Sequence, residues 1–168
     1  MKNLVSILLA FVVICSGMFH PGAAATLHAA PLKENLSPAT QQELARVRVA
    51  TAKYLDLFEA IADGYVNIDV FVSGQGFHYL KPSFLDGTFT ANKPELLVYA
   101  IDPAKNRLQL VCVEYAVPLD LSPNPPEGFT GDSDIWDVND DFGLWTLHCW
   151  LWKENPNGLF AEFSPRVP

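Results

Sequence analysis

The chain has 168 residues, 49% of them hydrophobic, and a formal net charge of −8 at pH 7. This length is sufficient for one hydrophobic core and is short for two ordinary domains. Asp and Glu total 19 against 11 Lys and Arg, and the basic residues form no stripe. Such an acidic chain would repel a phosphate backbone, so nucleic acid is excluded as an expected partner.

The first 25 residues have the pattern of a cleavable secretory signal peptide. Lys2 precedes an apolar run over 4–14, which is shorter than the about 20 residues that a membrane span needs. Small residues at Ala23 and Ala25 then suit signal peptidase, so we expect cleavage near Ala25.

Cleavage there would leave a flexible leader over 26–36 and a single domain over 37–168. The mature protein is then expected to be exported, either to the periplasm or to the medium, without stable membrane insertion.

A helix is predicted over 38–63. Ser37 can accept a hydrogen bond from a first-turn N–H, and Pro38 suits the first helical position. Gly64 can end the helix with a positive φ. Apolar side chains recur at steps of three and four and predict one buried stripe: Leu44, Val47, Thr51, Tyr54, Phe58, Ile61 and Tyr65.

The remainder reads as strands separated by turns. Runs of β-branched and aromatic residues between turn residues predict strands over 65–73, 77–80, 95–101, 107–117, 143–153 and 159–163, with an irregular segment over 118–142. One helix followed by five or six mostly hairpin-linked strands predicts an α+β fold. The helix would cover one face of a curved, mostly antiparallel sheet, with a split β-barrel as the alternative.

Three residues of the predicted strands are candidate metal ligands: His78, Glu114 and His148. A carboxylate in the middle of an apolar strand, like that of Glu114, is costly to bury without a partner, a metal or a wet cavity. Two imidazoles and one carboxylate suit a divalent transition metal, Zn or non-haem Fe, and leave coordination positions open for water or substrate. Without a tight ligand spacing such as HExxH, hydrogen-bonded core histidines and a Glu114 paired with Lys or Arg remain the alternative.

Two cysteines, Cys112 and Cys149, would survive cleavage, because Cys15 lies in the signal segment. In an oxidising compartment such a pair suggests a disulfide. Side chains alternate along strands, so in one sheet without a bulge the two predictions compete. If Glu114 and His148 share a face, Cys112 and Cys149 face opposite sides and cannot bond.

Aromatic residues near these positions suggest a pocket for a small apolar or planar ligand. Trp150 and Trp152 share the predicted strand face of His148, and Tyr79 and Tyr115 are the other candidate ligand-binding residues. Aromatic strands also commonly form ordinary core, and that alternative stays open.

The segment 131–141 holds five acids in eleven residues. Calcium favours such oxygen ligands, but the spacing does not match an EF-hand, so a solvated acidic loop is the preferred interpretation.

Several motifs resemble those of a group of exported bacterial proteins that are usually left uncharacterised. The motifs are Gly76-Phe77-His78-Tyr79, Val113-Glu114-Tyr115 and Leu147-His148-Cys149-Trp150-Leu151-Trp152 followed by Asn155-Pro156-Asn157-Gly158. The resemblance covers about residues 45–166 and implies export and a bacterial source, but it carries no catalytic role.

The sequence thus favours a secreted or periplasmic domain that binds a small ligand or a metal. A metal-dependent enzyme that uses the same His/Glu/His residues and a non-catalytic cell-surface interaction module are the alternatives.

Overall fold

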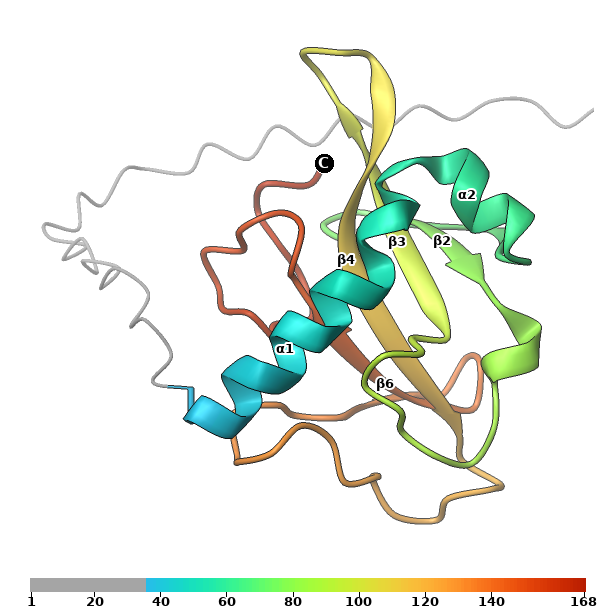
Figure 1. Cartoon of the computed structure of the whole chain (residues 1–168). Helices are drawn as coiled ribbons and strands as arrows, with labels where there is room; N and C mark the ends of the chain where they lie inside the picture. Colours follow the sequence, from blue (N-terminus) through green and yellow to red (C-terminus); the bar gives the residue numbers. More distant parts are fainter. Residues whose placement is uncertain (1–35) are drawn as a thin grey trace, which may run out of the picture.

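The computed structural model describes residues 36–168, so the signal peptide predicted over 1–25 lies outside the described residues (Figure 1). Six antiparallel strands form one sheet that curls into a half-barrel, and a helical segment accompanies it. The fold is therefore mixed α+β, as predicted. Within 36–168, none of the helices has the length and apolar character needed to cross a membrane.

The helical segment begins where the sequence predicts. Helix α1 (Pro38–Thr51) is capped by Ser37, whose Oγ accepts a hydrogen bond from the Thr40 amide at 3.1 Å. It continues as the 3-10 turn η1 (Ala52–Leu55). Its inward face buries the first part of the predicted stripe: Leu44, Val47, Thr51 and Tyr54.

The continuous helix predicted over 38–63 is interrupted at Asp56. This residue has an extended backbone, and its carboxylate caps the amide of Phe58 at the start of α2 (Leu57–Ala62). The break rotates α2, so that Ala60 is buried while Phe58 is 80% exposed and Ile61 is 50% exposed. The predicted stripe is therefore wrong at Phe58 and Ile61, because one extended residue resets the helical phase, whereas its last member Tyr65 is buried.

The sheet has the order β1-β2-β3-β4-β6-β5, and every neighbouring pair is antiparallel. The strands are β1 (Val66–Val72), β2 (Gly76–Leu80), β3 (Leu96–Asp102), β4 (Arg107–Pro118), β5 (Asp137–Asn139) and β6 (Leu144–Cys149), and a 3-10 turn η2 (Pro82–Phe84) lies between β2 and β3.

The last part of the chain departs from the prediction. Strand β6 ends at Cys149 and does not reach 153, because the amides of Trp152 and Lys153 both turn to the carbonyl of Val111. The strand predicted over 159–163 does not form. The segment expected to be irregular over 118–142 instead supplies the short edge strand β5.

A bulge in β4 divides its side chains between the two faces of the sheet. Val98 pairs with Cys112 but Tyr99 pairs with Leu110, so Val111 is an extra residue. Leu110 consequently packs with the helix, and Cys112 lies on the other face. Simple alternation would place Leu110 and Cys112 on one face, and the bulge separates them.

The main core lies between the helical segment and one face of the sheet. Leu44 and Val47 of α1 pack there with the strand residues Tyr99, Val113 and Leu147. The Tyr99 hydroxyl donates a 2.7 Å hydrogen bond to the carbonyl of Tyr54, which fixes η1 on β3. The opposite face carries a smaller apolar cluster made of Val98, Ala100, Val111, Cys112, Trp150 and Val167.

Candidate metal centre

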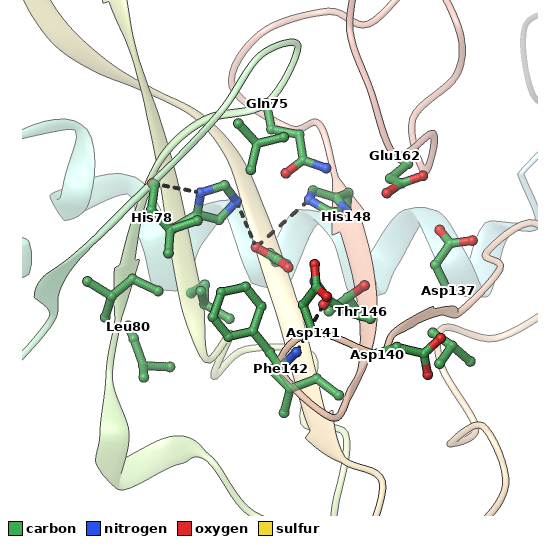
Figure 2. A pocket seen from close by; sticks show the side chains of 18 of the residues that line it. Gln75, His78, Leu80, Asp137, Asp140, Asp141, Phe142, Thr146, His148 and Glu162 are labelled. Carbon is green, nitrogen blue, oxygen red and sulfur yellow. Dashed lines mark hydrogen bonds and ion pairs between the residues drawn. The ribbon is translucent and has the colours of Figure 1, made fainter. Parts of the chain in front are cut away.

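His78, Glu114 and His148 meet on the sheet face opposite the helix (Figure 2). They come from β2, β4 and β6, and Glu114 is directly opposite His148 in the antiparallel ladder. Glu114 Oε2 lies 3.4 Å from His78 Nε2 and 3.8 Å from His148 Nε2. One ligand atom from each residue lies within 4.8 Å of the others.

The curl of the sheet explains how His78 reaches Glu114. Strand β3 lies between β2 and β4, and strands two apart in a sheet are separated by about 9.5 Å. Both side chains lean across Val98 and Leu96 of β3, the residues paired with them in the register. A flat sheet would hold the two groups farther apart.

The hydrogen bonds of the three residues are incomplete. His78 Nδ1 lies 3.3 Å from the carbonyl of Val70, which directs Nε2 toward Glu114. In contrast, Glu114 Oε2 and both ring nitrogens of His148 are buried without a hydrogen-bond partner. Each unsatisfied buried group costs about 1–3 kcal/mol of folding stability. The three residues would therefore destabilise the fold if their role were purely structural.

Burial keeps the three groups uncharged in the absence of a ligand. Desolvation raises the pKa of Glu114 to about 8, and the charges of Glu95 and Glu162 add to the rise. Desolvation lowers the pKa of His148 to about 3, with a further contribution from His78. It also lowers the pKa of His78, against the effect of the Val70 carbonyl. The 3.4 Å contact of Glu114 with His78 is therefore a weak neutral contact at pH 7 and not an ion pair.

The triad lies at the base of a pocket of about 540 Å³. Its rim includes Asp141 and Phe142 from the turn between β5 and β6, and Glu162 from the C-terminal segment (Figure 2). A volume of this size is typical of small-molecule sites. All three triad residues line this pocket, and the unpaired atoms of Glu114 and His148 are buried beneath its surface.

The two cysteines lie on opposite faces of the sheet, as strand alternation predicts when Glu114 and His148 share a face. Cys112 is in the cluster beside the triad, and Cys149 is in the core beneath the helix. They do not form a disulfide. The bulge at Val111 does not disturb this relation, because it precedes the residues that pair with β6.

The four aromatic residues predicted to line the ligand pocket do not line it. Tyr79 and Tyr115 are buried in the core on the helix side. Trp150 belongs to the smaller cluster, and its indole N–H donates to the carbonyl of Ala161. Trp152 packs at the edge of the main core and donates to Thr51 Oγ1. Trp150 therefore shares the face of His148, as expected, whereas Trp152 packs on the helix side because β6 ends at Cys149.

The acids of 131–141 do not gather into a calcium site. Asp134 accepts a hydrogen bond from the Phe129 amide, and Asp137 lies in β5. Among residues 36–168, the one group of three or more His, Cys, Asp or Glu residues with metal-ligand spacing is His78, Glu114 and His148.

Sequence reasoning missed the acids that line the pocket, namely Asp137, Asp140, Asp141 and Glu162. The density of acids over 131–141 was a sequence signal for Asp137, Asp140 and Asp141. It did not indicate that these residues line the pocket. No sequence feature marks Glu162, because it lies outside any helix or strand.

Comparisons with protein-family models, curated proteins and solved structures give no match for this chain. The resemblance to exported bacterial proteins therefore stays a prediction.

Proposed function

We propose that this protein is a divalent transition-metal-binding domain, with His78, Glu114 and His148 as the protein ligands and Zn(II) or Fe(II) as the ion. The observation that carries the proposal is the convergence of three buried donor groups within 4.8 Å, several of whose atoms have no hydrogen-bond partner. Two imidazoles and a carboxylate are the donor set that these ions prefer.

The alternative of ordinary core polar residues is less consistent with the contacts. Buried polar groups in proteins are nearly always paired, and Glu114 has no Lys or Arg partner among the described ion pairs. An ion at the triad would use Glu114 Oε2 and a nitrogen of each imidazole at once. It would remove most of the cost of burying these groups.

The pocket supports a second candidate, a metal-dependent enzyme. Structural zinc sites usually close with four protein ligands, whereas catalytic sites use three and leave a position for water or substrate. Here three ligands face a cavity of about 540 Å³. Such an ion could lower the pKa of a bound water or polarise a carbonyl group.

Elemental analysis of the purified chain after incubation with Zn(II) or Fe(II) tests the metal site. We expect stoichiometric metal in the wild type and little in His148→Ala. Thr146→Val is the matched control, because Thr146 is a buried neighbour on the same face of β6 and is not in the triad. Circular dichroism of each variant verifies that it is folded.

A wild-type chain without stoichiometric metal would overturn the proposal, as would a folded His148→Ala that keeps its metal. Glu114→Gln gives a second comparison, since the amide preserves the shape of the side chain and removes the anionic ligand. We expect its metal content to fall as well.

We further propose that the protein is exported, as the segment 1–25 predicts. Cell fractionation with N-terminal sequencing tests this, and a mature chain that begins near residue 26 is the expected result.

A further inference from the structure

The pocket above the triad has two chemically different walls (Figure 2). One wall is apolar and comes from β1, β2, the segment between β2 and β3, and the start of β3. It comprises Ile68, Val70, Val72, Leu80, Leu85 and Leu96. The other wall comes from β5, the turn after it and the C-terminal segment, and it includes the apolar Val138 and Phe142. Its four acids, Asp137, Asp140, Asp141 and Glu162, are what we call the acidic wall.

The acidic wall has no basic residue to neutralise it. Among the described residues that line the pocket, none is Lys or Arg. The ion pairs that Lys and Arg form elsewhere in 36–168 are Lys53–Asp63, Lys105–Asp102 and Arg166–Glu154. Asp140, Asp141 and Glu162 are exposed to solvent and Asp137 is half-buried, so the wall presents carboxyl groups without a basic partner at the mouth of the cavity. Burial raises the pKa of Glu162, and the charge of Asp137 adds to the effect.

A second observation in the same cavity points to a ligand. Glu114 is only 5% exposed and His148 only 3% exposed, yet Glu114 Oε2 and both nitrogens of the His148 ring lack a hydrogen-bond partner. Both residues line the cavity. Polar groups that are buried and unpaired at the base of a pocket indicate that the pocket is shaped for an occupant.

We propose that this pocket binds a small organic cation with an apolar body, of the alkylammonium or arylalkylammonium class. The ammonium group faces Asp137, Asp141 and Glu162, and the apolar body lies against Val70, Leu80 and Leu96. Carboxylate and phosphate compounds are disfavoured, since their negative charge would be repelled by the carboxylates of the acidic wall.

The inference goes beyond the proposed metal site and does not require it. A divalent ion at the triad would offset Glu114 and one further carboxylate at most. The acidic wall would keep a net negative charge, so the preference for a cation holds with and without metal.

Four probes distinguish the contributions of the two walls to ligand affinity: hexylammonium, hexanoate, hexanol and methylammonium. Ligand-observed NMR and calorimetry on the full chain, with and without Zn(II), measure their affinities. We expect hexylammonium to bind at least about 10-fold more tightly than hexanol, and hexanoate to be weaker than both. Methylammonium carries the charge without the apolar body and should bind more weakly than hexylammonium.

The double variant Asp141→Asn, Glu162→Gln tests the acidic wall directly. We expect it to lose most of the preference for hexylammonium over hexanol while it keeps the affinity for hexanol. Asp132→Asn is the matched control, because Asp132 is an exposed acid of the same loop that does not line the pocket.

Equal or tighter binding of hexanoate would overturn the inference, and so would an unchanged preference in the double variant or no binding of hexylammonium. The metal site is judged separately by the metal content of the same samples. His148→Ala should lose metal and still prefer hexylammonium, so a failure of one proposal is distinguishable from a failure of the other.

Discussion

Glu95 is a second buried carboxyl group, and its surroundings differ from those of Glu114. It is 2% exposed just before β3, and its Oε2 accepts a 3.0 Å hydrogen bond from the amide of Ala116. Burial raises its pKa to about 8, despite the lowering effect of that hydrogen bond. Glu95 has a protein partner and lies outside the triad. Its effect on stability therefore measures the burial of a carboxyl group independently of metal binding.

Glu95→Gln is predicted to flatten the pH dependence of stability. The pKa of Glu95 is higher in the folded chain than in the unfolded chain, so the folded chain binds more protons between about pH 4.5 and pH 8, and stability falls as pH rises there. The amide cannot ionise, so the variant should lose a slope of about 1.4 kcal/mol per pH unit. Urea unfolding at several pH values measures this. A slope equal to that of the wild type would show that Glu95 is already ionised at neutral pH.

Strand alternation correctly predicts the facing of several individual residues. Glu114 and His148 face each other because the pairing of β4 with β6 runs without a bulge from Val113 to Pro118. Alternation by itself excludes Tyr79 and Tyr115 from the site, since each directly follows a triad residue on its strand. Their selection as ligand-binding residues relied on aromatic character instead, and aromatic character does not distinguish core from pocket.

At the scale of elements, the start of β2 determines where His78 lies. Gly76 has a φ of +126°, and a Cβ at this position would lie 2.3 Å from the carbonyl oxygen of Tyr99 in β3. Only glycine therefore lets β2 approach β3 this closely. His78 is two residues further along the same strand, so the spacing of β2 and β3 also positions the imidazole.

Gly76→Ala is predicted to destabilise the fold by about 3 kcal/mol and to weaken metal binding, because β2 must move away from β3. Gly64→Ala is the control, since Gly64 also has a positive φ but its Cβ would have nothing within 4 Å. That control should cost about 1 kcal/mol, the price of the backbone conformation alone. Thermal unfolding and metal titration of both variants provide the comparison. Equal losses in the two variants would exclude the role of the close approach.

Element boundaries account for most of what the sequence did not reveal. The N-cap at Ser37 and the glycine that follows α2 are local signals, and both are confirmed. The break at Asp56 has a local cap, the bond to the Phe58 amide, whereas the bulge at Val111 and the end of β6 at Cys149 involve contacts between distant segments. The bond from the Trp152 amide to the Val111 carbonyl is one example, and no local pattern encodes it.

At the scale of the whole molecule, the proposed ion would connect three strands. The triad residues come from β2, β4 and β6, and β3 lies between β2 and β4. These ligand atoms come together only in the folded chain, so an ion that binds there binds the native state and stabilises it by mass action.

Zn(II) is predicted to raise the melting temperature of the wild type and of Thr146→Val, but not that of His148→Ala. A free concentration about 100-fold above Kd stabilises the fold by about 2.7 kcal/mol, which corresponds to roughly 10 °C for a domain of this size. Differential scanning calorimetry with and without a chelator measures the shift. An equal shift in all three proteins would place the metal elsewhere.

Cys112 and Cys149 face opposite sides of the sheet, which limits the cross-links that the chain can form. A covalent bridge between them is sterically impossible in this sheet, so the oxidising compartment predicted for the protein offers it no disulfide between these residues. Coordination of His78 and His148 to one ion would serve the same purpose. It would join β2 to β6 across about 70 residues of chain, but only in the folded state, which it would stabilise by binding and not by restricting the unfolded ensemble. A reversible coordinate bond would thus take the place of a covalent one, and the strength of this cross-link would follow the supply of metal.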